Sequence, residues 1–323
     1  MKEEKLIFLI SQPRSGSTLT QKLLGEHSKI YTKSESWVML GPAFLLKKDG
    51  IDAKYNTSLS QKAIDDFYVG LPDGKKTYIS ELRKMYLRLY STYLQNSGCE
   101  YFLDKTPRYY FIVDELLQIF PNAKYVLLVR NPLAVLGSII NSWTKNDWNR
   151  LKEYEHDLYE AVDVYNNAID SKNKNILIIY YEELLKRDVA VLKKAFNHIG
   201  VDYEKVSDSY YENMEKWKYG DQYNVYKNKG IIKDNDKKWQ NKLSNQQYWR
   251  VMNDYLNHIG KKKFEKIGYD FEEQKEILNN NMPMDSIDEI EEATKPLDYF
   301  LGSEYRSKYS SFCKKVLQKV CRL

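Results

Sequence analysis

Short apolar runs alternate with longer segments of helical spacing through the first part of the chain. The runs typical of strands are KLIFLIS (residues 5–11), SKIYTK (28–33), EYFLDK (100–105), AKYVLLVR (123–130) and the start of KNILIIYYEELLK (174–186). The cores VLLV and ILII have no polar face, which is what a parallel sheet covered by helices on both sides requires. The pattern therefore predicts an α/β domain of three layers, in which helices flank a central parallel sheet.

Two segments depart from this alternation. Residues 36–98 contain KTYISELRKMYLRLYSTYLQNSG, whose helical spacing predicts a long helical insertion. Residues 205–242 are polar and aromatic with little periodicity, and a loop of that length in a compact domain is usually functional or disordered. Two C-terminal helices are expected beyond it, in SNQQYWRVMNDYLNHIG and KKKFEKIG. We therefore assign one domain to residues 1–270.

The composition changes after residue 270. Residues 271–300 are strongly acidic and are expected to form a linker, whereas residues 301–323 are basic and end in SFCKKVLQKVCRL, a candidate amphipathic helix. A solvated or docked terminal helix fits this end of the sequence. A helix that contacts a membrane surface or a partner fits it as well.

The overall composition excludes some classes of protein. The net charge of +5 is too small to predict nucleic-acid binding through bulk charge. No apolar run approaches the roughly 18 residues of a membrane span, and MKEEKLIFLISQP is better explained as a strand than as a signal peptide. Cys99, Cys313 and Cys321 have no metal-ligand spacing and are too few for a disulfide framework. The sequence thus predicts a cytoplasmic protein without a metal site.

The segment QPRSGSTLTQKLL joins the first apolar run to a helix through a glycine-bearing turn, as a phosphate-binding loop does. The usual loop has a lysine after its second glycine, but here Gly16 is followed by Ser17 and Thr18, and the nearest cation is Arg14. The backbone N–H groups of Ser15, Gly16, Ser17 and Thr18, together with the helix dipole, are sufficient to hold a phosphate. The predicted fold is therefore P-loop-like, with an anion site at this loop.

A second anion site is expected where AKYVLLVRNP ends in Arg130. A kinase or NTPase would need an acid near this point to hold magnesium. A nucleotide with phosphates at both ends of its ribose fits two metal-free anion sites, and 3′-phosphoadenosine 5′-phosphosulfate (PAPS) has this form. Its 5′ phosphosulfate would lie on the loop, and its 3′ phosphate would meet the Arg130 fork. Ser138, eight residues after Arg130, would bind the same phosphate.

These motifs resemble those of the PAPS-dependent sulfotransferases. QPRSGSTLTQKLL is similar to the 5′-phosphosulfate loop of that family, and VLLVRNPLAVLGSIINSW is similar to its 3′-phosphate motif. LDKTPRYY and FPNAKYVLLVRNP occur in the same order and spacing, and the resemblance covers about residues 6–145 with weaker similarity to about residue 245. The arginine form of the loop is similar to the carbohydrate and tyrosylprotein branches and their bacterial relatives.

The resemblance implies three catalytic residues. Arg14 takes the place of the loop cation beside the leaving phosphate, and Lys105 in DKTP matches a lysine that stabilises the transferring group. Glu35 in YTKSESW follows the second strand, 21 residues after Arg14, and is our candidate for the base. His27 is the alternative base. The structural alternatives are a surface arginine, an acid that favours a helix start, and a Lys105 that only pairs with Asp104.

Further cofactor contacts are implied beyond the first motifs. Tyr181 resembles the aromatic residue that meets the adenine, although a packed tyrosine at a strand end also fits. The late loop YKNKGIIKDNDKKWQNKLS is similar to the segment that closes over the nucleotide, with Lys227, Lys229 or Asn235 near phosphate. This loop lacks the family's glycine-rich RKG run, so its register is open, and a solvated face is the alternative.

The function implied is transfer of the sulfuryl group from PAPS to a hydroxyl, which leaves adenosine 3′,5′-bisphosphate (PAP). A glycan or glycolipid is the preferred acceptor, because aromatic platforms with polar rims suit sugar rings, and the basic C-terminal helix would allow contact with a membrane. Tyrosylprotein and small-metabolite acceptors are the first alternatives. A P-loop kinase, a non-catalytic nucleotide-binding module and an RNA-binding protein are the more distant ones.

Overall fold

The computed structural model describes residues 1–47, 51, 53–186, 188–206 and 235–283. Contacts divide the chain into two compact units, one formed by Met1–Arg130 with Val164–Asn235 and the other by Asn131–Asp163 with Asp236–Leu323. Most of the predicted loop 205–242 and the basic tail 301–323 lie outside the described residues. The single domain expected over residues 1–270 stays a prediction.

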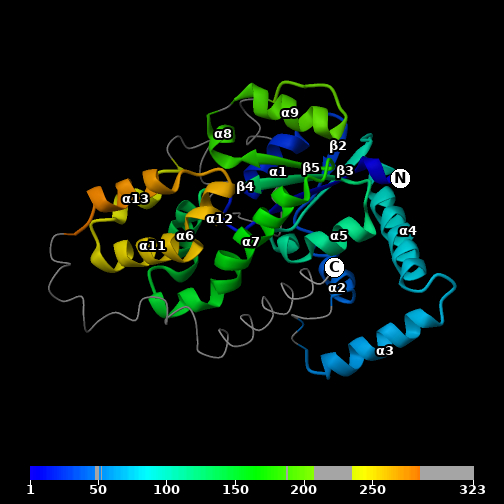
Figure 1. Cartoon of the computed structure of the whole chain (residues 1–323). Coiled ribbons are helices and arrows are strands. Elements are labelled where there is room, and N and C mark those ends of the chain that lie inside the picture. Colours follow the sequence, from blue (N-terminus) through cyan, green and yellow to red (C-terminus); the bar gives the residue numbers. More distant parts are fainter. Residues whose placement is uncertain (48–50, 52, 187, 207–234, 284–323) are drawn as a thin grey trace. The chain divides into compact units, whose positions relative to one another are not determined.

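The first unit is built on a parallel sheet, as the apolar pattern predicts (Figure 1). Its strands are β1 (Leu6–Ser11), β2 (Ile30–Thr32), β3 (Tyr101–Lys105), β4 (Lys124–Val129) and β5 (Ile176–Tyr180), in the order β2-β3-β1-β4-β5. Every neighbouring pair is parallel. Since parallel strands end at one edge of the sheet, the segments that follow all five strands are brought to that edge.

Helices cover both faces of the sheet, which explains why the central strands lack a polar face. On one face, α1 (Ser17–Gly25) and α9 (Val189–Ile199) pack with Leu9 and Val126 in the main core cluster. On the other, Phe8 stacks on Tyr125 and contacts Phe120, just after α5 (Val113–Ile119). The alternation of Phe8 and Leu9 between the two faces is the period-two pattern of a strand. The predicted three-layer α/β fold is confirmed.

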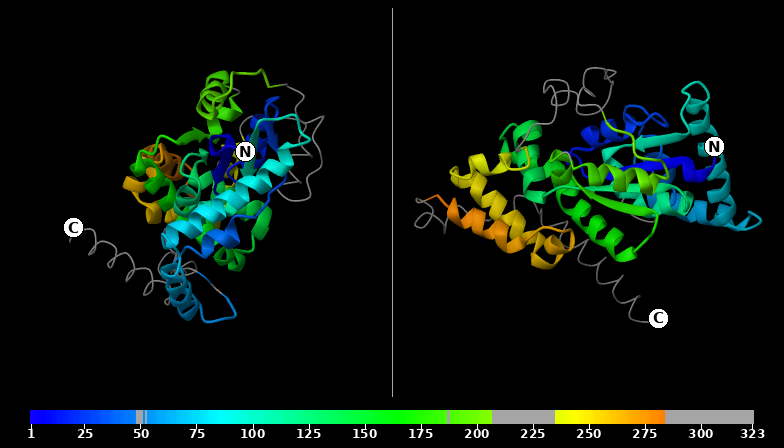
Figure 2. Two further views of the ribbon diagram at one scale, coloured as in Figure 1. Left: turned by 90° about the vertical axis from the view of Figure 1, so that its right-hand side faces the viewer. Right: turned by 90° about the horizontal axis from the view of Figure 1, so that it is seen from above.

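The predicted helical insertion is also confirmed. It contains α2 (Leu40–Phe44), α3 (Thr57–Val69) and α4 (Lys75–Leu94). The helix α4 buries Leu82, Tyr86 and Tyr90 at helical spacing and contacts β3 and α5, whereas α3 lies farther from the sheet (Figures 1 and 2). The ring of Tyr90 lies 4.8 Å from that of Phe102 on β3.

Shorter helices complete the first unit. They are the 3₁₀ helices Glu3–Lys5 and Pro107–Ile112 and the short helix α8 (Tyr181–Leu185), which follows β5 directly. The helix α7 (Glu155–Ser171) runs through both units.

The second unit is helical among its described residues. It contains α6 (Pro132–Ile139), a π-helical turn (Ile140–Thr144), 3₁₀ helices at Trp148–Tyr154 and Lys238–Lys242, and α11 (Gln246–Ile259), α12 (Lys261–Lys266) and α13 (Phe271–Asn280). The side chains of Asn131, Asn245 and Asp270 cap α6, α11 and α13. The two predicted C-terminal helices are confirmed as α11 and α12, and α13 covers the first residues of the expected acidic linker.

Gly137 on α6 allows close packing in the second unit. A Cβ at this position would lie 2.7 Å from the hydroxyl oxygen of Tyr248 and 2.8 Å from Cβ of Trp239. The absence of a side chain at Gly137 therefore lets α6 approach α11. Within the described residues, no helix combines the length and apolar character that crossing a membrane requires.

Candidate active site

The loop between β1 and α1 has the backbone form of an anion site. Gly16 is the N-cap of α1 with a φ of 91°, and Arg14 also has a positive φ, of 68°. No side chain caps the helix, so the N–H groups of its first turn have no partner within α1. Left-handed residues alternating with right-handed ones turn successive N–H groups toward one point.

The residues of the loop fit a phosphate. Ser15 is fully buried, and its hydroxyl has no hydrogen-bond partner among the described residues. Ser17 and Thr18 open α1, where their N–H groups and the helix dipole favour an anion. A buried hydroxyl and an uncapped helix start are donors placed where an anionic group would use them.

Tyr181, from the start of α8, lies directly on Gly16. A Cβ added to Gly16 would be 2.2 Å from Cε2 of the tyrosine ring. Glycine is therefore required here for two reasons, the left-handed backbone and the close ring. The predicted role of Tyr181 against adenine stays a prediction.

Arg130 connects the loop with residues far along the chain. Its Nη1 donates to the carbonyl of Arg14 and its Nη2 donates to the carbonyl of Asn235, both at 2.9 Å. The guanidinium lies 4.4 Å from the ring centre of Tyr181, whose hydroxyl accepts a hydrogen bond from Nδ2 of Asn235 at 2.8 Å. Four of the predicted cofactor residues, Arg14, Arg130, Tyr181 and Asn235, are thus brought together.

The candidate base and one candidate cation form a buried ion pair. Glu35 follows β2 and Lys105 ends β3, and Nζ of Lys105 lies 2.8 Å from Oε1 of Glu35. The same ammonium lies 3.4 Å from Oγ1 of Thr18, in the first turn of α1. Lys105 is 1 % exposed. Two predicted catalytic residues therefore meet at the N-terminal end of α1.

Trp37 is a neighbour of the candidate base that sequence reasoning missed. Its indole Nε1 donates to Oε2 of Glu35 at 3.2 Å, and its backbone N–H donates to Oγ1 of Thr106 at 3.1 Å. Trp37 has a φ of 57° and remains 47 % exposed. The only sequence signal was a tryptophan two residues after the candidate base, and no periodicity indicated its contact.

A second missed feature is the environment of Asp104. Its carboxylate accepts hydrogen bonds from Ser36 at 2.8 Å, Tyr90 at 2.7 Å and Tyr109 at 3.0 Å. Burial raises the pKa of Asp104, against the opposing effect of these hydroxyls and of the Lys105 charge. Asp104 and Lys105 are consecutive on β3, so their side chains point to opposite faces. Lys105 forms an ion pair with Glu35, whereas the alternative from the sequence was a Lys105 that only pairs with Asp104.

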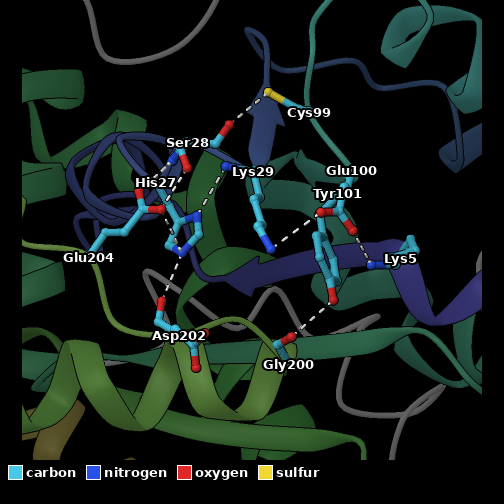
Figure 3. A network of polar contacts seen from close by, with 10 residues as sticks. All are labelled: Lys5, His27, Ser28, Lys29, Cys99, Glu100, Tyr101, Gly200, Asp202 and Glu204. Atoms are coloured by element: carbon cyan, nitrogen blue, oxygen red, sulfur yellow. Dashed lines mark hydrogen bonds and ion pairs between the residues drawn. The ribbon is translucent and has the colours of Figure 1, made fainter.

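His27, the alternative base, lies at the other edge of the sheet. It precedes the start of β2, whereas Glu35 follows its end. Its Nε2 lies 2.9 Å from the carbonyl of Asp202, and its Nδ1 accepts the N–H of Lys29 at 3.1 Å (Figure 3). Glu204 lies beside this ring and accepts two hydrogen bonds from Ser28. The geometry therefore favours Glu35 as the base.

The remaining predicted residues are not part of this cluster as described. Ser138 lies on α6, in the second unit. Lys227 and Lys229 lie outside the described residues. Among the residues that the structure describes, no group of three histidine, cysteine or acidic residues is arranged to hold a metal.

A family model places the chain in a class of enzymes. The model of the sulfotransferase family matches residues 7–205, which include the loop, Glu35, Lys105, Arg130 and Tyr181. The match covers more than half of the chain, and the protein belongs to the sulfotransferase family.

Two curated proteins align with part of the chain. The chain is 36 % identical over 141 residues to the nodulation protein NoeE of Sinorhizobium fredii, an alignment covering 43 % of this chain and 32 % of NoeE. It is 23 % identical over 211 residues to a putative protein-tyrosine sulfotransferase of Caenorhabditis briggsae, covering 62 % of this chain and 68 % of that protein. The chain thus spans about a third of the length of NoeE.

Solved structures give weaker likenesses. A sulfotransferase domain from the curacin biosynthetic pathway aligns over 72 % of this chain and 89 % of its own, with 20 % identity and a TM-score of 0.47. A sulfotransferase domain from the Synechococcus PCC 7002 olefin synthase aligns over 73 % and 86 %, with 23 % identity and a TM-score of 0.48.

Replacement of Gly16 by alanine is expected to destabilise the protein. The new methyl group would force a left-handed backbone on alanine and would overlap the Tyr181 ring, so the free energy of unfolding should fall by about 2 kcal/mol. Gly41→Ala is the matched control, because its Cβ would enter open space on α2. Urea denaturation measures both, and an equal effect of the two substitutions would contradict the prediction.

Asp104→Asn is expected to change how stability depends on pH. Because burial raises the pKa of Asp104 above 3.8, the folded protein keeps this proton at pH values where the unfolded chain has lost it. The free energy of unfolding therefore falls as pH rises from about 4 through the folded-state pKa, and the asparagine variant lacks this contribution.

The measurement is urea denaturation of the wild type and of Asp104→Asn over a series of pH values. The stability of the wild type relative to the variant should decrease as pH rises. Asp66→Asn, at an exposed position on α3, controls for the loss of one negative charge. A relative stability that rises with pH, or does not vary with it, would show that burial does not dominate at Asp104.

Proposed function

We propose that this protein transfers the sulfuryl group of PAPS to a hydroxyl acceptor, preferably on a glycan. The observation that carries the proposal is the contact of Lys105 with both Glu35 and Thr18. Through these contacts the buried Lys105 cation joins a candidate proton acceptor, Glu35, to the start of α1, where the anion would bind. Sulfuryl transfer to an alcohol needs these three elements.

The chain offers a complete set of groups for the donor. The N–H groups of Ser15–Thr18 would hold the 5′ phosphosulfate, and Arg130 would hold the 3′ phosphate. The ring of Tyr181 lies against Gly16 of the loop, and Asn235 donates to the Tyr181 hydroxyl. Ser138, Lys227 and Lys229 are assigned to the phosphates from the sequence alone. When bound, PAPS supplies an activated sulfuryl group and a phosphate leaving group.

Each catalytic residue has one task in this proposal. Glu35 accepts the proton of the acceptor hydroxyl, because its carboxylate pairs with the Lys105 ammonium, which also contacts Thr18 in the first turn of α1. Lys105 and Arg14 stabilise the negative charge that develops on the leaving oxygen. The burial of Lys105 strengthens its electrostatic effect, since water screens it little.

The acceptor class has one supported alternative. The likeness to a putative protein-tyrosine sulfotransferase favours a tyrosine hydroxyl as the second candidate. The P-loop kinase is disfavoured by membership of the sulfotransferase family and by the absence of a lysine after Gly16. A non-catalytic nucleotide-binding module would keep the loop and Arg130 without needing Glu35.

Binding of PAP should stabilise the protein against heat. A ligand present at a hundred times its Kd adds about 2.7 kcal/mol, and PAP without metal should act more strongly than AMP or ATP with magnesium. Arg130→Ala should remove most of this effect, because the 3′ phosphate loses its bidentate partner.

The matched control for Arg130→Ala is Arg88→Ala, at an exposed position on α4. It should keep the response of the wild type to PAP. Thermal melts with each nucleotide provide the measurement. Stabilisation by ATP with magnesium alone would reject PAPS as the donor.

Glu35→Gln should separate an enzyme from a binding module. Loss of the base is expected to lower the rate of sulfuryl transfer by about 10²-fold to 10⁴-fold, while PAP still stabilises the variant. Transfer from labelled PAPS to a pool of glycan and tyrosine acceptors gives the rate. Glu4→Gln, at an exposed position before β1, is the control. A Glu35→Gln variant as fast as the wild type would remove Glu35 as the base.

A further inference from the structure

Trp37 is held in place although its side chain is half exposed. Trp37 belongs to the segment Ser36–Met39, which is held by four hydrogen bonds. Each of them joins a residue of this segment to β3, to the residues that follow β3, or to α4. They are Ser36 Oγ to Asp104, Trp37 N–H to Thr106 Oγ1, the Tyr86 hydroxyl to the carbonyl of Val38 at 3.2 Å, and Met39 N–H to the Tyr109 hydroxyl at 3.3 Å. The exposed indole therefore projects from an anchored backbone.

The conformation of Trp37 is one that local preferences oppose. A φ of 57° is unfavourable for a bulky side chain and costs about 1–3 kcal/mol. Trp37 is also nearly half exposed, so its large apolar side chain contributes less hydrophobic stabilisation than it would if it were buried. The anchors of the segment maintain both features, and strain of this kind is concentrated at functional sites.

The indole N–H of Trp37 and the ammonium of Lys105 each donate to a different oxygen of the Glu35 carboxylate. Lys105 lies 2.8 Å from Oε1, and Nε1 of Trp37 lies 3.2 Å from Oε2. Each oxygen thus has one donor from a different segment, which restricts rotation of the carboxylate. Since the indole ring is joined to the same N–H, this half-exposed ring lies beside the candidate base.

We propose that Trp37 orients Glu35 through its indole N–H and that its exposed face receives the pyranose ring of the acceptor. The proposal rests on the function proposed above and names the part of the acceptor that is recognised. The C–H bonds on one face of a pyranose complement the negative face of an indole ring. The four residues directly before Trp37 in the chain, Lys33 to Ser36, are all polar, and a polar segment suits an acceptor with several hydroxyls better than a phenol with one.

The indole N–H resonances provide a direct test. The chain has six tryptophans, so a ¹⁵N-labelled full chain gives few indole signals, and the signal of Trp37 is the one missing from Trp37→Phe. Glu35→Gln should move this signal, because a neutral acceptor replaces a charged one, and Glu4→Gln should leave it in place. An unmoved signal in Glu35→Gln would overturn the orienting role.

Acceptor contact is tested on the same signal in the presence of PAP. The probes are the methyl pyranosides of glucose, galactose and N-acetylglucosamine, with N-acetyltyrosinamide as the phenol. At least one pyranoside should shift the Trp37 signal in a saturable way and leave the other indole signals in place. A response to the phenol alone, or to none of the probes, would overturn the pyranose platform.

Kinetics with PAPS and the responding pyranoside separate positioning from packing. Trp37→Phe keeps a ring but lacks the N–H, so kcat should fall about tenfold while KM changes little. Trp37→Leu lacks both, so KM should rise about tenfold as well. Equal losses in both variants, confined to kcat, would leave no role for the ring.

These measurements also distinguish failure of the inference from failure of the proposed function. If PAP leaves the melting temperature and the indole spectrum unchanged, the donor assignment fails. The Glu35→Gln comparison needs no nucleotide, so it still reports on the contact between Trp37 and the carboxylate. If PAP binds and no pyranoside moves the Trp37 signal, the inference alone fails.

Discussion

The arrangement of the site depends on the pairing of the buried Lys105 ammonium with its neighbours. Lys105 is 1 % exposed, and burial of a charge is costly unless the charge is paired. Its ammonium forms an ion pair with Glu35 and a hydrogen bond with Thr18. The end of β3 therefore requires the segment after β2 and the first turn of α1 to approach it. Removal of one partner of a buried pair typically costs about 3–5 kcal/mol, because the other charge is then buried without a partner. Lys105 and Glu35 therefore depend on each other.

The strand β3 also has an acid on its opposite face, directly before Lys105. Asp104 gathers hydroxyls from Ser36, Tyr90 and Tyr109, and Tyr90 belongs to the inserted helix α4. The two consecutive residues thus anchor the insertion on one side and the candidate base on the other. Because Ser36 lies between Glu35 and Trp37, the two networks are joined through the backbone of a single short segment.

Arg130 has a similar connecting role at the end of β4. It donates to the carbonyl of Arg14 in the first loop and to that of Asn235 late in the chain. The close approach of Tyr181 depends on glycine at position 16, since a side chain there would displace the ring, and Gly16 also has a left-handed backbone. The proposed site is therefore a set of mutually supporting contacts between segments that follow different strands.

The sequence by itself determined the parallel sheet, because short apolar runs without a polar face are typical of strands that helices cover on both sides. Local motifs in the sequence also located the loop at Arg14–Thr18 and the cation at Arg130. Membership of the family was also readable from those motifs. Tertiary structure decided that Glu35 and His27 lie at opposite edges of the sheet, that Lys105 pairs with Glu35, and that Trp37 donates to Glu35. These depend on contacts between residues far apart in the chain, or on a strained backbone that distant anchors impose, and neither leaves a periodic signal in the sequence.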